Sequence, residues 1–396
     1  MVYLKTKVCI ITARFSPFGG VETSIYELAR RLVKKGLEVE VHASRTGSNP
    51  NVEFVEGIKV IRHRILFMLF RAPVNPAIPI AVMKQKDADV IHVVSTYPTI
   101  SDLGLLFGRI AMRPVVLAYH FDGEAYGFLG RLFQRMYLSL FAKWVDMFAT
   151  IVVSTTRSYV NTSPVLGRTR KPLVVVPNAV DLQRFNPSVD GREARRRFNI
   201  SENAKVVLFV GRLVPYKGLE YLIESMSKIL DEHKNVVLMV VGEGELEREL
   251  FALTKRRGIQ DSVIFTGRVD ESLLPHCYAA SDMLVLPSVS RQEAFGIVVI
   301  EAFASGKPVI STSIAGVREV VRPGETGLMV PPGDAESLAN AIGELLRNDE
   351  LRREMGRRAR LLAEEKYDWN RIVDRYLGVY DLALERGPSN VQLGVG

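Results

Sequence analysis

The distribution of hydrophobic residues along the chain predicts two successive halves, each built from strands that alternate with helices. Short apolar runs are separated by stretches in which apolar positions recur at helical spacing. The strands predicted in the first half are Val8–Ile11, Val39–Ala43, Val90–Val94, Val115–Tyr119, Thr150–Val153 and Leu173–Val176. Because strands that alternate with helices pair in parallel, this half predicts a parallel sheet covered on both faces.

The second half repeats this alternation without repeating the sequence. Its predicted strands are Lys205–Val210, Val236–Val241, Val263–Phe265, Met283–Leu286 and Val309–Ser311, and its predicted helices are Gly218–Asp231, Glu245–Arg257, Glu271–Ala280 and Ile297–Ser305. The polar segment 188–203 is interpreted as a linker, which predicts domains at 1–187 and 204–367. A last helix is expected over 368–386.

Composition narrows the class of protein. The chain has 396 residues, of which 47% are hydrophobic and 24% charged, as in ordinary globular proteins with room for two cores. Lys and Arg outnumber Asp and Glu by 52 to 44, so we expect anionic partners. The only cysteines, Cys9 and Cys277, lie in an apolar run and a helical stretch, which argues against disulfides or a thiolate metal site. With no signal-peptide pattern at the start, we expect a cytoplasmic protein.

Two carboxylates bracket a predicted helix start in the second half. Glu293 lies in the turn after a strand, and Glu301 lies inside the next helix, so the two are expected roughly 8 to 12 Å apart. The helix N-terminus at Gly296 lies between them and favours an anion. This arrangement suits a nucleotide sugar, whose hydroxyls face the carboxylates and whose diphosphate faces the helix. A chance pairing of two glutamates is the alternative.

Other candidate residues also follow predicted strands. Arg212 and Lys217 lie in the loop after Val210 and suit a diphosphate whose charge rises as its bond to a sugar breaks. Gly267 opens a further loop on the same edge. In the first half, Gly19-Gly20 and His120 occupy corresponding positions, where ligands collect in open α/β sheets. The alternatives are a tight turn for the glycines and a structural role for His120.

Taken together, these residues resemble glycosyltransferase family 4, the retaining nucleotide-sugar transferases of GT-B architecture. The resemblance covers nearly the whole chain and rests on the order and spacing of several motifs: Gly19-Gly20-Val21-Glu22, His120, Pro177–Asp181, Gly211-Arg212, Lys217-Gly218, Gly267, Glu293–Glu301 and Gly324–Pro331. It implies an α/β fold with two Rossmann-like domains facing each other across a cleft. It also implies that the last helix crosses back to the first domain.

The resemblance also implies roles for individual residues. Gly20 would approach the donor phosphate, His120 would contact the transferred sugar, and Arg212 with Lys217 would hold the diphosphate. Glu293 would bind sugar hydroxyls and Glu301 the ribose hydroxyls. The loop that contains Arg268 and Val269 would contact the base. The backbone amides of the segment after Glu293 would contact phosphate and sugar: Ala294, Phe295, Gly296 and Ile297. The reaction would retain the anomeric configuration and need no metal or other cofactor.

The acceptor is suggested by an apolar segment, Leu129–Phe148, in which Arg131, Arg135, Ser139 and Lys143 fall four apart. This pattern suits a helix that lies on an anionic membrane at the inner face of the cell, and burial of the helix in the domain is the alternative. A second candidate patch is 64–71. Because the chain is also similar to phosphatidylinositol mannosyltransferases and to the subunit that adds N-acetylglucosamine to phosphatidylinositol, a lipid-linked acceptor is expected.

Three alternatives remain at this stage. The acceptor could be a soluble sugar or sugar phosphate, with the same chemistry at the donor. A catalytically silent sugar-binding relative would lack the full set of charged positions that this chain has. Nucleic-acid binding is disfavoured, because the basic residues are spread over both halves without an aromatic platform or a recognition motif. The donor is expected to be a UDP- or GDP-sugar.

Overall fold

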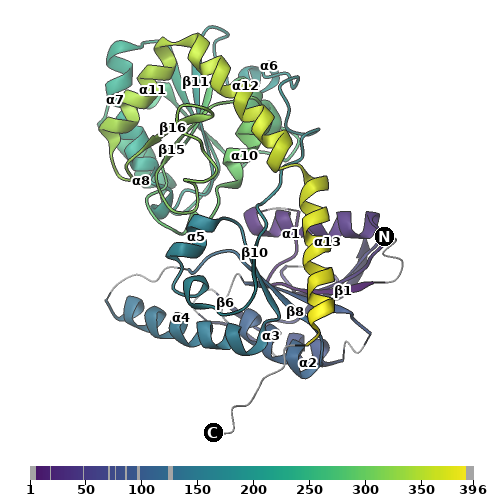
Figure 1. The fold of residues 1–396 in the computed structure, drawn as a ribbon. Helices are drawn as coiled ribbons and strands as arrows, with labels where there is room; N and C mark the ends of the chain where they lie inside the picture. The colour runs from purple at the N-terminus through teal and green to yellow at the C-terminus, as the bar shows by residue number, and fades with distance from the viewer. Residues whose placement is uncertain are drawn as a thin grey trace. The chain divides into compact units, whose positions relative to one another are not determined.

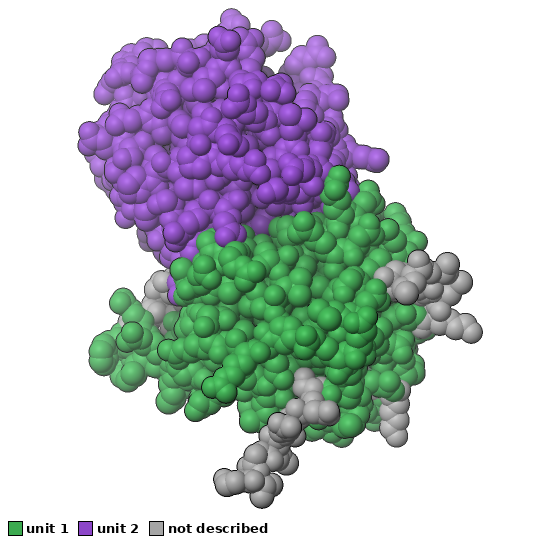
Figure 2. Space-filling model, in the orientation of Figure 1, with its two compact units in different colours: residues 1–177, 370–396 green, residues 178–369 purple. Residues whose placement is uncertain are grey.

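The fold is taken from a computed structural model, which describes residues 6–17, 19–47, 49–69, 72–75, 77–84, 87–95, 99–123 and 128–388. The chain forms two compact units (Figures 1 and 2). Unit 1 comprises residues 1–177 and 370–396, and unit 2 comprises residues 178–369. The segment 188–203, expected to be a linker, therefore belongs to unit 2.

Unit 1 is built on an eight-stranded sheet with the order β10-β9-β8-β7-β1-β2-β4-β3. All neighbouring strands are parallel except β3 and β4, which form an antiparallel hairpin. The strands are β1 Lys7–Ile11, β2 Glu38–Ser44, β3 Val52–Val55, β4 Ile58–His63, β7 Val90–Ser95, β8 Val115–Tyr119, β9 Ile151–Ser154 and β10 Leu173–Val175. A separate two-stranded sheet pairs β5 Phe67–Leu69 with β6 Ala72–Val74.

Helices cover both faces of the sheet in unit 1. They are α1 Gly20–Lys34, α2 Ala77–Met83, α3 Ile100–Ile110, α4 Phe128–Phe148, α5 Arg157–Thr162 and α13 Trp369–Arg386, with a 3-10 turn at Leu166–Arg168. Helix α3 packs on the face that carries Ile91 and Val93, where Gly108 brings its backbone close to the strands. Helix α13 packs on the opposite face, where the Tyr380 hydroxyl lies 2.7 Å from Nδ1 of His92. The last helix of the chain is therefore a structural part of unit 1.

Unit 2 contains a six-stranded parallel sheet with the order β13-β12-β11-β14-β15-β16. Its strands are β11 Lys205–Val210, β12 Val236–Val241, β13 Val263–Gly267, β14 Met283–Leu286, β15 Val309–Thr312 and β16 Gly327–Val330. Its helices are α6 Arg192–Arg197, α7 Leu219–Glu232, α8 Glu247–Arg256, α9 Leu274–Ala280, α10 Ile297–Ala304, α11 Ala335–Arg347 and α12 Asp349–Lys366, with 3-10 turns at Pro215–Lys217 and Gln260–Ser262.

Two hydrophobic cores lie on the two faces of this sheet. One core gathers residues of α9, α10 and α12, and the other gathers residues of α7, α8 and α11 (Figure 1). The strands are nearly continuous runs of Val, Leu and Ile because both faces of each strand are buried. The predicted strands of this unit match the structure closely, and only β16 was not predicted.

The structure differs from the sequence-based interpretation at two places. Segment 188–203 contains α6, in which Arg195 donates to the carbonyl oxygens of Ser201 at 2.7 Å and Ala280 at 2.9 Å. It is therefore an ordered part of unit 2. The hairpin β3–β4 was not predicted at all. The candidate patch 64–71 contains β5, and its residues 70 and 71 lie outside the described residues.

Helix α4 has a buried face and an exposed face. Leu138, Phe141, Ala142 and Val145 are buried. The exposed side chains include large apolar residues, among them Phe128 at 83% exposure and Leu129 at 77%, together with Leu132, Phe133, Met136 and Leu140. The basic residues predicted to form a stripe, Arg131, Arg135 and Lys143, are also exposed. The helix thus packs on unit 1 by one side and presents an apolar and basic surface on the other.

Candidate active site

The donor-site residues predicted in unit 2 lie in loops at the carboxyl edge of its sheet, or in the helix that follows such a loop. The loop after β11 carries Arg212 and Lys217, the loop after β13 carries Arg268 and Val269, and Glu293 follows β14. Gly242, which follows β12, donates its backbone N–H to the carbonyl oxygen of Gly267 at 2.9 Å, so the loops after β12 and β13 are tied together. Ligands of open α/β sheets bind at this edge.

A buried ion pair joins two of the predicted residues. Nζ of Lys217 lies 2.5 Å from Oε2 of Glu293, and the two side chains are 9% and 11% exposed. The hydroxyl of Ser288 donates to the same carboxylate oxygen at 3.1 Å. Burial alone would lower the pKa of Lys217, but the neighbouring Glu293 carboxylate outweighs that effect and raises it. Lys217 is therefore cationic at neutral pH, and its ammonium group has two N–H donors besides the one that faces Glu293.

The backbone of this region is closely packed and requires glycine at particular positions. Gly218 adopts a φ of 64°, and a Cβ atom there would lie 2.3 Å from the carbonyl oxygen of Pro287. A Cβ atom on Gly316 would lie 2.1 Å from the carbonyl oxygen of Glu293. Contacts this short cannot form, so both glycines are needed to hold the loop that carries Glu293.

Glu301 lies on the second turn of α10, eight residues after Glu293. Burial raises its pKa, while a hydrogen bond of 2.6 Å from the Tyr278 hydroxyl opposes that increase. Tyr278 lies on α9, so two helices jointly orient this carboxylate. Arg184 also lowers the pKa of Glu301 through its charge.

The remaining predicted residues of unit 2 divide between exposed and core positions. Arg212 and Arg268 are exposed, and Val269 is half-buried. Phe295 is buried and packs edge-on against Tyr367, with ring centroids 5.9 Å apart, so only its backbone is available to a ligand. The helix α10 begins after Gly296, whose φ is 78°, and its first residues present backbone N–H groups at the positive end of the helix. Ala294 and Ile297, on either side of this start, are half-buried.

In unit 1, His120 directly follows β8 and is 6% exposed. Burial lowers its pKa to about 4, so the imidazole is neutral at pH 7. Its Nε2 atom is buried and has no hydrogen-bond partner among the described residues. Gly20 is exposed and begins α1 after the loop that leaves β1. Both residues therefore lie at the carboxyl edge of their sheet, as predicted.

A residue that the sequence did not single out holds the segment after His120. The Asp122 carboxylate accepts hydrogen bonds from the hydroxyls of Tyr119 at 2.7 Å, Ser163 at 2.7 Å and Tyr159 at 3.0 Å. The backbone N–H of Asp122 also donates to the Tyr159 hydroxyl at 2.8 Å. This buried network fixes the chain on both sides of His120. Tyr159 and Ser163 are far from Asp122 in the sequence. The only sequence signal for the role of Asp122 is therefore its position two residues after His120.

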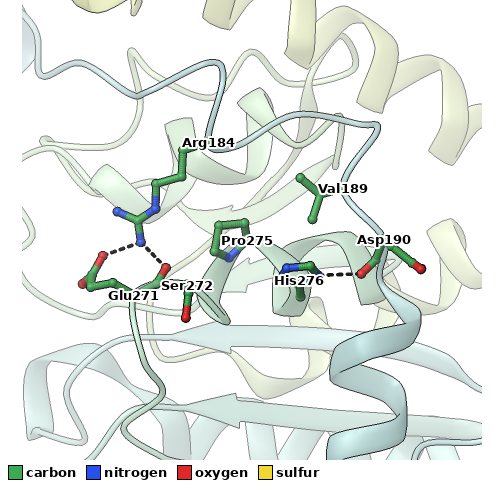
Figure 3. A pocket seen from close by; sticks show the side chains of 7 residues that line it. All are labelled: Arg184, Val189, Asp190, Glu271, Ser272, Pro275 and His276. Atoms are coloured by element: carbon green, nitrogen blue, oxygen red, sulfur yellow. Dashed lines mark hydrogen bonds and ion pairs between the residues drawn. The ribbon is translucent and has the colours of Figure 1, made fainter.

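An open hollow of about 590 Å³ lies beside α9 and is lined by Arg184, Val189, Asp190, Glu271, Ser272, Pro275 and His276 (Figure 3). Arg184 forms an ion pair with Glu271, and Nδ1 of His276 lies 2.7 Å from the carbonyl oxygen of Asp190 (Figure 3). None of the predicted site residues lines this hollow. Within the described ranges, no group of three or more His, Cys, Asp or Glu side chains is arranged to hold a metal ion.

Comparison with known proteins identifies the family. Residues 18–184 match the family described as Glycosyltransferase Family 4, and residues 190–362 match the family described as Glycosyl transferases group 1. The chain is 30% identical to a D-inositol 3-phosphate glycosyltransferase of Geodermatophilus obscurus, over 95% of this chain and 88% of that protein. The chain belongs to glycosyltransferase family 4. It is an enzyme of the hexosyltransferase class.

Other relatives and solved structures agree with this assignment. The chain is 27% identical to a phosphatidyl-myo-inositol mannosyltransferase of Mycobacterium leprae, over 95% of this chain and 96% of that protein. Its fold matches sucrose-phosphate synthase of Thermosynechococcus elongatus with a TM-score of 0.80 at 23% identity, covering 96% and 100% of the two chains. It matches Anabaena HepE in complex with UDP-glucose with a TM-score of 0.77 at 22% identity, covering 95% and 99%. The fold of this family 4 glycosyltransferase is therefore GT-B.

Among the described helices, none combines the length and the hydrophobicity required to span a bilayer.

Proposed function

We propose that this family 4 glycosyltransferase moves a hexose or N-acetylhexosamine from a UDP- or GDP-sugar to a lipid-linked acceptor such as a phosphoinositide. The anomeric configuration would be retained, and no metal ion would be required. The buried pair of Lys217 and Glu293 carries the donor part of this proposal. It combines a fixed cation with a carboxylate that already accepts a hydrogen bond from the Ser288 hydroxyl, just before the N-terminus of α10. HepE, which has a similar fold, is known in complex with UDP-glucose.

The proposed chemistry follows from where charge develops. As the bond between sugar and diphosphate breaks, negative charge accumulates on the leaving phosphate oxygens, and fixed donors that face those oxygens lower the barrier. Lys217, Arg212 and the first N–H groups of α10 supply that positive potential. A front-face path, in which the leaving phosphate helps to deprotonate the acceptor hydroxyl, would retain the configuration. His120, neutral and buried, would contact the transferred sugar as a hydrogen-bonding group rather than as a charge.

The lipid-linked acceptor is supported by the exposed surface of α4. Its apolar side chains, led by Phe128 and Leu129, are accompanied by exposed Arg131, Arg135 and Lys143. Apolar and basic side chains together on the exposed side of one helix suit the interface of an anionic membrane. The enzyme would then act as a peripheral protein at the cytoplasmic face. The Mycobacterium leprae relative is named for a phosphatidyl-myo-inositol acceptor.

A soluble acceptor is the second candidate, because the Geodermatophilus obscurus relative is named for inositol 3-phosphate. Transfer assays distinguish the two. Radiolabelled UDP- and GDP-hexoses would be supplied with either phosphatidylinositol vesicles or inositol phosphate, with and without EDTA. We expect transfer to the vesicles, unaffected by EDTA, with the product's anomeric configuration read by NMR. Lys217→Ala and Glu293→Ala should abolish transfer, whereas Lys228→Ala, which removes an exposed lysine, should not. Full activity in both site variants would refute the site assignment.

A further inference from the structure

Three arginines follow the carboxyl ends of three adjacent strands in unit 1. Strands β1, β2 and β4 are neighbours in the sheet and run parallel. Arg14 lies just beyond β1, Arg45 directly follows β2, and Arg64 directly follows β4, and all three residues are exposed. Parallel strands lie about 4.8 Å apart and end at the same edge, so long side chains from these positions reach a common ligand.

Hydrogen bonds fix the backbone that carries these arginines. The N–H of Ser44 donates to the carbonyl oxygen of Ala13 at 3.2 Å, and the N–H of Arg45 donates to that of His63 at 2.8 Å. The buried side chain of Asn75 donates to the same His63 oxygen at 2.9 Å. The three arginines therefore project from a rigid edge rather than from independent loops.

The positive charge at this edge is not neutralised by neighbouring carboxylates. Among the described residues, none of the three arginines forms an ion pair, whereas nearby Arg62 pairs with Glu53. The segment 57–86, which includes Arg64, contains no Asp or Glu. Cations grouped on a surface without counter-charges create a field that attracts anions.

Two carboxylates on the neighbouring elements β2 and α1 are already engaged by other groups. Glu40 is buried within β2, where it accepts hydrogen bonds from Lys59 at 2.8 Å and interacts with Nε2 of His42 at 2.9 Å and Nζ of Lys7 at 3.7 Å. Burial opposes its ionisation, but these partners lower the pKa of Glu40 to about 2. Glu22, in the first turn of α1, folds back over the backbone of Gly19.

We propose that Arg14, Arg45 and Arg64 form a subsite for the phosphate group of the acceptor. This inference rests on the proposed function, because it assigns the acceptor's charge to the edge of unit 1 on which His120 also lies. Strand β1 lies two strands from β8, strand β2 three and strand β4 four, which places the three arginine positions about 10 to 20 Å from His120. That distance leaves room for the transferred sugar and a ring-sized acceptor between His120 and the phosphate. Arginine suits this role because its planar fork binds phosphate oxygens in pairs.

Strand β5 begins three residues after Arg64, and the exposed residues at this point distinguish two sources of the phosphate. Leu66, Phe67 and Met68 are 68%, 51% and 50% exposed. These exposed apolar side chains, beside a phosphate subsite, would contact the acyl chains of a phospholipid, whereas a free sugar phosphate would make no use of them. The subsite itself is predicted to bind the phosphate from either source.

The test measures acceptor binding by calorimetry and acceptor KM for three probes: inositol, inositol phosphate and phosphatidylinositol vesicles. Arg14→Ala, Arg45→Ala and Arg64→Ala should each raise the KM for inositol phosphate about tenfold and leave the donor KM unchanged, with Arg45→Lys less impaired. Arg197→Ala, which removes an exposed arginine of unit 2, is the matched control and should have no effect. Phe67→Ser with Met68→Ser should weaken only the vesicle interaction.

The subsite is refuted if the triple arginine variant binds both phosphorylated probes like the wild type. It is also refuted if the wild type binds neither of them, or binds inositol as well as inositol phosphate. Donor binding is measured separately through nucleotide-sugar stabilisation of unit 2. A chain that binds inositol phosphate through the arginines but no nucleotide sugar would refute the proposed function and leave the subsite intact.

Discussion

Removal of one partner from the buried pair of Lys217 and Glu293 should destabilise unit 2 strongly. The charged atoms lie 2.5 Å apart. At an effective dielectric constant of about 20, they attract by roughly 7 kcal/mol, and the cost of removing each ion from water offsets most of that. A single substitution leaves the other charge buried and uncompensated. We therefore expect Lys217→Met and Glu293→Gln each to lower the free energy of unfolding by about 3 to 5 kcal/mol.

The double variant provides the decisive comparison. It buries neither charge, so its loss should be much smaller than the sum of the single losses, with a coupling energy of at least about 2 kcal/mol. Because Trp369 lies at the boundary between the two units, its fluorescence does not report on unit 2 alone. Hydrogen exchange of the amides in β11 to β16, read by mass spectrometry at increasing urea, reports on unit 2 separately. Single losses that add to within about 0.5 kcal/mol would refute the pairing.

Three further predictions concern the pH response and the packing of the site. Tyr278→Phe removes the hydrogen bond that opposes the raised pKa of Glu301, so the acidic limb of the donor kcat/KM profile should move to higher pH; an unchanged profile would contradict this role. The pKa of His120 falls from its ordinary value to about 4 in the folded state, so the unfolded state binds more protons between about pH 6.5 and 4, and stability is lost as the pH falls through that window. At pH 5 this loss is about 2 kcal/mol, and His120→Gln should reduce the pH dependence of unit 1 unfolding by that amount, whereas an equal dependence in both proteins would exclude it. Gly316→Ala should destabilise unit 2 by about 1 to 3 kcal/mol through the contact with the Glu293 carbonyl, while Gly378→Ala in α13, where a Cβ atom meets nothing within 4 Å, should be neutral or slightly stabilising in thermal unfolding.

The strands of both sheets were predictable because most are buried on both faces. The run Lys205–Val210 contains little besides Val, Leu and Phe, and its bounds match β11. The hairpin β3–β4 was missed because its strands alternate between charged and apolar residues, as in Ile58-Lys-Val-Ile-Arg-His63, and no continuous apolar run marks them. The signal that predicts this hairpin is alternation with a period of two residues beside the turn at Glu56-Gly57, where both residues have positive φ.

The predicted site residues fall at the expected edges because parallel strands end together, which is a property of topology rather than of side chains. The contacts between these residues, by contrast, depend on tertiary packing and cannot be predicted from the order of the strands. Nothing in the spacing of Lys217 and Glu293 predicts their ion pair, which depends on how two loops pack around Gly218. The roles of Tyr278, Ser288 and Asp122 likewise arise from tertiary contacts. The polar composition of segment 188–203 is typical of a linker, yet the side chain of Arg195 donates to backbone carbonyls of unit 2.

The central claim is that the carboxyl edge of unit 2 binds a nucleotide sugar through Lys217. The most direct measurement is the stabilisation of unit 2 by UDP- and GDP-sugars in the wild type and in Lys217→Ala, each compared with its own ligand-free form. A ligand at a hundred times its dissociation constant should stabilise the wild type by about 2.7 kcal/mol, and this gain should disappear in the variant. Equal stabilisation of both proteins, or none by any nucleotide sugar, would contradict the account.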